Sequence, residues 1–319
     1  MRKAIGIDLG GTTVKGVVMS EDGICEHITR VPTEAQKGGQ QVLANILSLI
    51  AELIQKSSLQ ASDFVGAGLG TPGFVDNDGT VSGAENLPGW KGTNIYTPIK
   101  ERFGLKVTAA NDVTAVAMAE QRYGAGRGVN NIVCFALGTG IGGGIVIDGK
   151  LYKGTHGMAG EIGHIVVETD GIQCNCGLKG CVERYASATG IVNLALEYTK
   201  SASGNNLTPF VEIVRGSPSK VTSKMVYEYV AAGDAVALKV HHKACDMLAR
   251  AVGIILNTLS PDRVVLGGGV MMAGNVILDT VKECIPRYCW PNIYEHCEIV
   301  LAQMGEDAGV MGAAAMAFE

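Results

Sequence analysis

Long apolar runs are missing from this sequence. A transmembrane helix needs ~20 predominantly apolar residues, and the nearest stretch, Ala244 to Leu259, is interrupted by Asp246 and Arg250. A secretory signal is missing as well, because it needs ~7–15 apolar residues and a cleavage site, and only a very short apolar run precedes Asp8. We therefore expect a cytoplasmic protein, in which the nine cysteines stay mostly reduced.

Excess positive charge is absent too. The chain has 26 Lys and Arg residues against 31 Asp and Glu residues, for a net charge of -5. Nucleic acids and anionic membranes attract clustered basic charge. We expect neither as a partner, and the composition leaves a small molecule as the expected ligand.

What the chain has in quantity is glycine and apolar material. With 319 residues and 47% hydrophobic content, it is long enough for about two domains at ~150 residues each. The 44 glycines predict many tight turns and close backbone approaches.

Two segments repeat one pattern. "KAIGIDLGGTTVKGVVMSEDG" near the start and "CFALGTGIGGGIVIDGKLY" downstream both read as strand, glycine loop, strand and Asp-Gly turn. Gly10 corresponds to Gly138, a separation far longer than the 20–50 residues of solenoid repeats, so the pattern predicts two domains of similar plan. Each loop leads into a strand rather than a helix, which excludes the dinucleotide fingerprint and the P-loop.

Helical and strand patterns alternate along the rest of the chain. The pattern predicts strands at "FVGAGLGT", "GLKVTAA" and "RVVLGGG", and the alternation indicates an α/β protein. Turn residues in 200–223 predict a surface excursion there. Helices are expected at 41–54 (with Leu43, Leu47, Ile50 and Ile54 on one face), 112–123, 184–198, 235–259 and the closing "GVMGAAAMAF".

The two glycine loops, "DLGGTT" and "LGTGIGGG", fit phosphate binding, because glycine lets backbone N–H groups crowd an anion. Asp8 could hold Mg²⁺ against the phosphates, usually through water. Facing each other across a cleft, the loops would hold a nucleoside triphosphate; plain hairpin turns are the alternative. The candidate nucleotide contacts are Gly10, Gly11, Thr12, Thr13, Gly138, Thr139 and Gly140, with Gly267 and Gly268 of "LGGGV" for the adenosine.

Asp112 opens a predicted helix, and Asn111 before it is a candidate N-cap. The helix dipole favours an ionised carboxylate at that position. A kinase needs one carboxylate to accept the proton of the attacking hydroxyl. Asp112 could fill that role, or could serve helix stability alone.

Three cysteines crowd the segment "QCNCGLKGCVE". Cys174, Cys176 and Cys181, with His164 ten residues earlier, would complete a tetrahedral zinc shell with no open position, which indicates structural zinc. Three unligated thiols are the alternative, and a disulfide is not expected in a reducing compartment. The other six cysteines read as small apolar residues.

Glu161 and Glu183 flank the cysteine segment, so zinc would hold both carboxylates in place. Paired carboxylates accept hydrogen bonds from the vicinal hydroxyls of a sugar, and a preorganised polar site discriminates strongly between substrates. The alternative places both glutamates on a solvated loop.

Taken in order, "GIDLGGTTVKG", "GLGTPGFVD", "ENLPGW", "NDVTAVAMAE", "GMAGEIGHIVV" and "CNCGLKGCVE" resemble the ROK family of repressors, open reading frames and sugar kinases over essentially the whole chain. The resemblance implies an actin-like, hexokinase-type pair of ribonuclease-H-like domains with an interdomain cleft. The first domain would cover 1–114 and about 300–319, and the second 115–299. The resemblance also implies a homodimer or a tetramer.

The resemblance assigns roles that agree with the residue patterns. Asp112 would be the catalytic base, and His164 would bind zinc through one ring nitrogen and a sugar hydroxyl through the other. One departure is Thr13, where many members carry lysine; Lys15 lies two residues on. The implied sugar contacts are Asn111, Glu161, His164 and Glu183, with Gly73 and Asn86 as further candidates, and the implied zinc ligands are His164, Cys174, Cys176 and Cys181.

The implied reaction is ATP-dependent phosphorylation of a hexose. "NLPGW" resembles the glucokinase branch, so glucose is the first expected acceptor, with ATP, Mg²⁺ and structural Zn²⁺ as cofactors. N-acetylmannosamine, N-acetylglucosamine, allose and fructose remain alternatives. Two further classes are a sugar-responsive repressor, for which we expect an additional N-terminal DNA-binding domain, and an ATPase of the actin or chaperone type, which the zinc pattern argues against.

Overall fold

The computed structural model describes residues 1–84 and 87–319; at residue 205 it describes the backbone only. These residues form two compact units. The first unit consists of Met1–Ile132, Gly144–Gly160 and Gln303–Glu319, and the second of Val133–Gly143 and Glu161–Ala302. We describe each unit by itself.

The first unit therefore extends past the boundary at 114 that the sequence analysis expected. The helix α3 (Asp112–Tyr123) belongs to it because the C-terminal helix α11 (Ala308–Met316) packs directly on α3. A Cβ atom at Gly312 would come within 1.9 Å of the Ala115 carbonyl oxygen. Glycine at this position allows the two backbones to touch.

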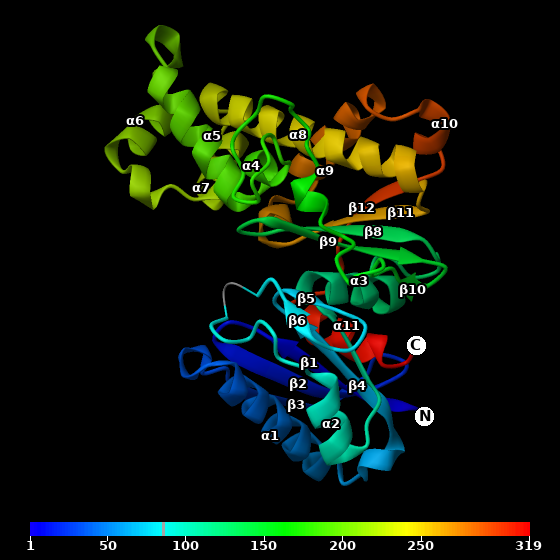
Figure 1. The fold of residues 1–319 in the computed structure, drawn as a ribbon. Helices are drawn as coiled ribbons and strands as arrows, with labels where there is room; N and C mark the ends of the chain where they lie inside the picture. Colours follow the sequence, from blue (N-terminus) through cyan, green and yellow to red (C-terminus); the bar gives the residue numbers. More distant parts are fainter. Residues whose placement is uncertain (85–86) are drawn as a thin grey trace. The chain divides into compact units, whose positions relative to one another are not determined.

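The first unit is built on a five-stranded mixed sheet in the order β3-β2-β1-β4-β7. The antiparallel pairs β1–β2 and β2–β3 are followed by the parallel pairs β1–β4 and β4–β7 (Figure 1). The strands are β1 (Lys3–Leu9), β2 (Thr13–Ser20), β3 (Cys25–Pro32), β4 (Phe64–Thr71) and β7 (Val107–Asn111), with a small separate hairpin of β5 (Phe74–Val75) and β6 (Val81–Ser82).

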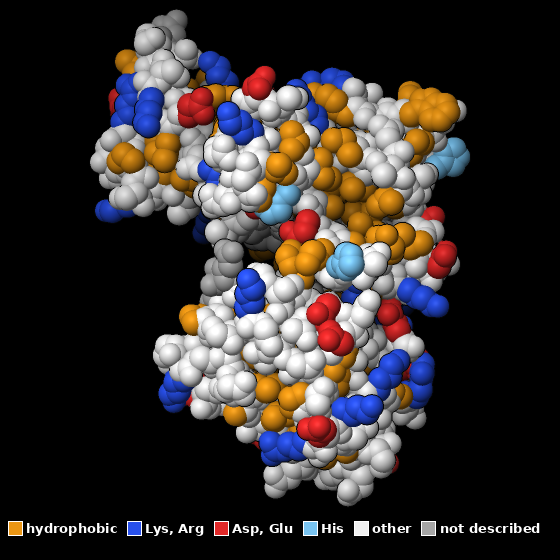
Figure 2. Space-filling model, viewed as in Figure 1, with side chains coloured by type: hydrophobic (Ala, Val, Ile, Leu, Met, Phe, Trp, Pro, Cys, Tyr) orange, Lys and Arg blue, Asp and Glu red, His pale blue; other side chains and the backbone are white. Residues whose placement is uncertain are grey.

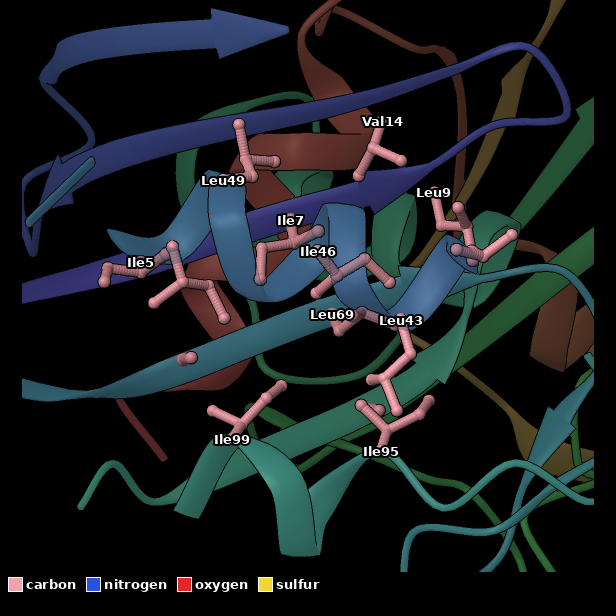
Figure 3. Packing of buried hydrophobic residues seen from close by; sticks show 14 of the residues in the cluster. Ile5, Ile7, Leu9, Val14, Leu43, Ile46, Leu49, Leu69, Ile95 and Ile99 are labelled. Atoms are coloured by element: carbon pink, nitrogen blue, oxygen red, sulfur yellow. The ribbon is translucent and has the colours of Figure 1, made fainter. Parts of the chain in front are cut away.

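One face of this sheet is apolar because successive strand side chains alternate between faces. Ile5, Ile7 and Leu9 of β1 are fully buried on this face. They belong to one core cluster with side chains of α1 (Gly39–Ser57) and α2 (Tyr96–Phe103), as Figure 3 shows. Each such side chain stabilises the fold by ~1.5–3 kcal/mol. The buried side of α1 consists of Val42, Leu43, Ile46, Leu49, Ile50 and Leu53, so Leu47 and Ile54 lie nearer its edge than the sequence analysis expected.

The opposite face of the sheet carries glycines, such as Gly6, which alternates along β1 with Ile5 and Ile7 of the apolar face. Cβ atoms at Gly6 and Gly68 would come within 2.3 Å of the Val310 carbonyl oxygen and 1.7 Å of the Ala313 carbonyl oxygen. The alanine-rich α11 therefore lies directly against the sheet backbone. Asp8 follows Gly6 by two residues, so it lies on the same face as α11.

Gly68→Ala is expected to destabilise the protein by about 3 kcal/mol, because the new methyl group meets backbone atoms that cannot rotate away. Urea unfolding followed by circular dichroism measures the loss. Gly305→Ala is the matched control, since a Cβ there has no neighbour within 4 Å. Equal stability of the two variants would contradict the close packing of α11.

The second unit contains most of another five-stranded sheet, in the order β10-β9-β8-β11-β12. The strand β9 runs on into the first unit, where β10 pairs with its end. The strands are β8 (Ile132–Leu137), β9 (Ile141–Ile147), β10 (Lys150–Leu151), β11 (Arg263–Gly267) and β12 (Glu298–Leu301). The helices are α4 (Glu183–Ala186), α5 (Ala188–Ser201), α6 (Pro209–Gly216), α7 (Ser223–Ala231), α8 (Ala235–Leu259), α9 (Asn275–Cys284) and α10 (Pro291–Tyr294) (Figure 1).

Short 3₁₀ turns complete both units. Two of them, η3 and η6, carry or adjoin candidate site residues. The turns are η1 (Ala35–Lys37), η2 (Ala61–Asp63), η3 (Ile162–His164), η4 (Gly204–Asn206), η5 (Pro218–Lys220), η6 (Gly269–Ala273) and η7 (Ile285–Arg287).

The two predicted glycine hairpins and the 235–259 helix are confirmed. The expected helix 184–198 is divided at Ser187, whose hydroxyl accepts a hydrogen bond from the Gly190 N–H at 3.0 Å and begins α5. The prediction that 200–223 is only a surface excursion is wrong. Thr208 caps α6, and the helix buries Phe210 and Val211, so a capped amphipathic helix lies inside the turn-rich segment.

None of the helices in the described ranges is long and apolar enough to cross a membrane. On the face drawn in Figure 2, Lys and Arg side chains are interspersed with Asp and Glu side chains.

Candidate functional site

In the first unit, Asp112 begins α3 directly after β7. Asn111 caps the helix as predicted, since its Oδ1 accepts a hydrogen bond from the Val113 N–H at 3.0 Å. The Asn111 Nδ2 atom donates to the Gly73 carbonyl at 3.2 Å, and Gly73 has a φ of 86°. The structure therefore brings Gly73, Asn111 and Asp112 together.

Asp8 lies close to Asp112 because Gly70 separates them without a side chain. A Cβ atom at Gly70 would lie 3.5 Å from the Asp112 Cα and 3.8 Å from the Asp8 Oδ1. Burial, followed by the charge of Asp112, raises the pKa of Asp8 to about 6, against the opposing effect of Lys15. Burial also raises the pKa of Asp112, which suits a group that must accept a proton.

The carboxylates of Asp8 and Asp112 fit a magnesium ion chemically. Mg²⁺ takes oxygen ligands and retains several waters, and two partly buried carboxylates at one end of the sheet offer such oxygens. A cation would also relieve the repulsion between them. Asp8 is the residue that would hold the ion.

The Asp8 pKa predicts a pH-dependent stability. The folded-state pKa of about 6 exceeds the ordinary 3.8, so the folded protein binds the extra proton and loses stability as pH rises from about 4 to 6. Above that window Asp8→Asn should be more stable than the wild type by ~1–3 kcal/mol, and near pH 4 the gain should vanish. Urea unfolding across pH 4–7.5 without Mg²⁺ measures this; Glu101→Gln is the control, and a gain that does not change with pH would contradict it.

The first glycine loop connects β1 to β2. The N–H of Gly10 donates to the Thr13 carbonyl at 3.0 Å, and the Thr12 carbonyl accepts from the Thr33 N–H at 2.9 Å. The Gly10 amide thus closes the turn and is not available to an anion. Gly11, Thr12 and Thr13 are exposed, and they remain the candidates for phosphate contacts.

The second glycine loop, between β8 and β9, is closed in the same way. The Gly138 N–H donates to the Gly140 carbonyl at 2.9 Å, and the Ala188 N–H at the start of α5 donates to the Gly138 carbonyl at 2.8 Å. The loop is therefore fixed to α5. Thr139 lies exposed at its tip.

The four predicted zinc ligands come together in the second unit. One ligand atom from each of His164, Cys174, Cys176 and Cys181 lies within 4.8 Å of all the others. The Cys176 and Cys181 sulfurs are 3.6 Å apart, and the Cys174 sulfur lies 3.7 Å from the His164 Nδ1. Tetrahedral zinc with ~2.3 Å Zn–S bonds separates its ligands by about 3.7 Å.

The chemistry of this cluster also fits zinc. Burial, with the neighbouring thiols, raises the pKa of Cys181 to about 12. Such a thiol becomes a thiolate only beside a strong positive charge. With three sulfurs and one imidazole nitrogen the shell is complete, so the ion would be structural.

Glu183 links this cluster to the second glycine loop. Its Oε1 lies 3.1 Å from the Cys174 sulfur and 3.8 Å from the His164 Nδ1. Its Oε2 accepts a hydrogen bond from the Ile141 N–H at 3.5 Å. A Cβ atom at Gly140 would come 2.8 Å from the same Oε2, so Gly140 allows the loop to approach this carboxylate.

Glu161 lies on the other side of His164. The His164 Nε2 is 3.8 Å from the Glu161 Oε2, while Nδ1 faces the thiols. The histidine can therefore bind a metal with one nitrogen and present the other beside a carboxylate; the predicted contact of that second nitrogen with a sugar hydroxyl stays a prediction. Three polar groups, from Glu161, His164 and Glu183, thus border the metal cluster.

The helix α7 (Ser223–Ala231) was not predicted from the sequence. A cavity of about 580 Å³ lies between α7 and η6, beside the glycines that end β11. Gly268 has a φ of 90°, and a Cβ there would meet the Leu137 backbone at 2.5 Å, so Gly267 and Gly268 shape the turn while Gly269 borders the cavity. No motif marks α7 in the sequence. The lining residues are Ser223, Lys224, Tyr227, Glu228, Ala231, Gly269, Val270, Met272 and Ala273.

Two predictions remain, for Asn86 and for the other cysteines. Asn86, a predicted sugar contact, lies outside the described residues. Of the six cysteines away from the cluster, four are buried, in agreement with their interpretation as small apolar residues; Cys25 and Cys297 are only partly buried.

Comparison with known proteins decides the family. Residues 4–319 match the sequence model of the ROK family. The chain belongs to the ROK family. It is 37% identical to a glucokinase of Thermotoga maritima over 316 residues, which cover 98% of this chain and 96% of that protein.

Two solved ROK structures share the fold. A ROK hexokinase from Thermus thermophilus matches with a TM-score of 0.83 and 28% identity, covering 99% of this chain and 98% of its own. A ROK family glucokinase from Streptomyces griseus, in complex with glucose and AMPPNP, matches with a TM-score of 0.75 and 31% identity, covering 98% of both chains. The predicted actin-like, hexokinase-type fold is confirmed.

Proposed function

We propose that this ROK protein is an ATP-dependent hexose kinase that transfers the γ-phosphoryl group of ATP to the 6-hydroxyl of glucose. The observation that carries the proposal is the position of Glu183, whose carboxylate contacts both the His–Cys cluster and the second glycine loop. The same carboxylate thus lies beside the proposed sugar contacts and beside a proposed phosphate-binding loop. The similarity to glucokinases along the whole chain supports glucose as the acceptor.

The acceptor is held by hydrogen bonds from its hydroxyls. Glu161 and Glu183 accept these bonds, and His164 offers its Nε2 beside Glu161. Zinc bound by the thiols and Nδ1 would fix the histidine ring and both neighbouring carboxylates. Fixed polar groups reject sugars whose hydroxyls cannot pair with them.

The donor is held by both glycine loops and by the α7–η6 cavity. Gly11, Thr12, Thr139 and Gly140 contact the phosphates, and the cavity of about 580 Å³ receives the nucleoside. Its lining is mainly apolar and includes Tyr227 and Met272, which suits a planar base. This cavity favours a nucleoside triphosphate over a simple polyphosphate as the donor.

Asp112 carries out the proton transfer. Its carboxylate, capped onto α3 beside Asn111, accepts the proton of the sugar hydroxyl as the oxygen attacks the γ-phosphorus in line. Asp8 would hold Mg²⁺, which would supply positive charge to the phosphates. Exclusion of water from the reacting groups is required, because water would otherwise compete as the acceptor.

A coupled ADP-release assay over glucose, mannose, fructose, allose, N-acetylglucosamine and N-acetylmannosamine tests the proposal. We expect the highest kcat/KM for glucose. A clear preference for N-acetylmannosamine would support the kinase activity but replace glucose as the proposed acceptor. ATP hydrolysis at one rate with or without sugar would contradict the proposal and favour an ATPase.

The family resemblance also supports a homodimer. Sedimentation velocity at micromolar protein should give twice the mass of one chain, and a monomer at all concentrations would contradict this part of the proposal.

A further inference from the structure

Lys15 is a buried lysine that the mechanism above does not use. It lies on β2 directly opposite Asp8 of β1, and only 11% of its side chain is exposed. Residues directly opposite each other in an antiparallel pair point to the same face, with Cβ atoms ~4.5–5.5 Å apart. The ammonium group therefore projects from the same sheet face as the Asp8 carboxylate.

The partner of Lys15 comes from the other end of the chain. The Lys15 Nζ bonds to the Asp307 Oδ1, and Asp307 is the residue that begins α11. Its side chain makes no capping bond to the helix and is turned to the lysine instead. An N-terminal aspartate normally stabilises its helix by capping, so a different use of this side chain calls for an explanation.

A buried carboxylate fixes where Asp307 lies. Glu120 of α3 is only 1% exposed, and its Oε1 accepts hydrogen bonds from the N–H groups of Gln303 and Met304 at 3.1 and 2.8 Å. The chain is thus held on α3 just before α11. Gly309, two residues after Asp307, lies so close to Asp8 that a Cβ would come within 2.7 Å of its Oδ2.

Lys15 has acidic neighbours other than Asp307. Asp8 and Glu306 attract its charge, and Arg30 repels it. Without the Asp307 carboxylate, the ammonium group would turn to Asp8, because the two residues share one face and one register position. An ammonium group on Asp8 would compete with a magnesium ion for the same oxygens.

We propose that Asp307 is a positioning residue that holds the Lys15 ammonium group and so leaves the Asp8 carboxylate free for Mg²⁺. The inference rests on the proposed function. It assigns a role to a residue 299 positions after Asp8. The role is electrostatic, because Asp307 acts through the Lys15 ammonium group that it binds.

The test is a magnesium titration of nucleotide binding, measured by calorimetry with the non-hydrolysable analogue AMP-PNP. Asp307→Asn is expected to raise the Mg²⁺ concentration for half-maximal binding about tenfold, the effect of one partly buried charge pair. The double variant Lys15→Met/Asp307→Asn should return to within about twofold of the wild type, because the competing cation is gone. Asp307→Glu keeps the charge and should behave like the wild type.

Kinetics give a second readout. Asp307→Asn should raise the KM for MgATP and leave the KM for glucose unchanged. The control is Glu52→Gln, which removes the exposed pair between Glu52 and Lys56 on α1 and should change neither quantity.

The outcomes separate the two proposals. A double variant as impaired as Asp307→Asn, or an Asp307→Asn variant with the wild-type Mg²⁺ requirement, would overturn this inference alone. A wild-type protein that binds no Mg²⁺–AMP-PNP and phosphorylates no sugar would overturn the proposed function together with it.

Discussion

Asp112→Asn is expected to lower kcat by about 10³-fold, within the usual range for loss of a general base, while the Kd for glucose changes less than about threefold. The amide retains the size of the side chain and can still accept the hydrogen bond from the Val113 N–H, but it cannot accept the proton of the attacking hydroxyl. Coupled ADP release gives kcat, and calorimetry gives the Kd for glucose.

The raised pKa of Asp112 adds a signature to this experiment. Wild-type kcat/KM should fall at acid pH as the carboxylates of Asp112 and Asp8 take up protons, since burial raises both pKa values. The residual activity of the variant should lack the part of this decline that belongs to Asp112. Near-normal turnover in Asp112→Asn would remove this residue from the mechanism, and Glu101→Gln serves as the control for an acidic residue of the same unit.

Cys181→Ser is expected to abolish zinc binding and to lower kcat/KM for glucose by at least ~100-fold, as large as the greatest losses seen when groups supporting a metal site are removed. Cys181 is fully buried and lies 3.6 Å from the Cys176 sulfur, so no other side chain can take its place. Loss of the ion frees His164, and through it Glu161 and Glu183. The effect should therefore fall chiefly on glucose affinity.

Metal analysis and calorimetry measure the two parts of this prediction. The wild type should contain one zinc ion per chain, and the variant none. Cys297→Ser, in the same unit but away from the cluster, should retain both zinc and glucose affinity. If zinc-free protein bound glucose as tightly as the wild type, the cluster would have no role in the acceptor site.

Local features of the site could be predicted from the sequence because each depends on neighbouring residues. The spacing of Cys174, Cys176 and Cys181 predicted a set of zinc ligands, and the structure brings these three side chains together with His164. Asn111 caps α3 by accepting a hydrogen bond from the Val113 N–H, only two residues away. Both glycine loops turn between strands, as their flanking apolar runs predicted.

Other features depend on contacts between distant parts of the chain. Nothing near Lys15 in the sequence indicates Asp307, and nothing near Glu120 indicates Gln303 and Met304. The same cause explains the domain boundary, because the assignment of α3 to the first unit depends on how closely Gly312 approaches Ala115.

The cavity between α7 and η6 and the helix α6 escaped prediction for a different reason. The α7 residues that line the cavity, such as Tyr227 and Glu228, show no motif, because an apolar slot needs only shape. In α6, the turn-forming residues around Pro209 concealed a short amphipathic run. Pro209 in fact begins that helix, where its missing N–H costs nothing.

Phosphorus NMR of the protein with ATP, Mg²⁺ and glucose tests the central claim most directly. The account predicts one phosphomonoester signal, that of glucose 6-phosphate, growing in step with ADP and only when glucose is present. Inorganic phosphate released at the same rate with or without sugar would contradict it.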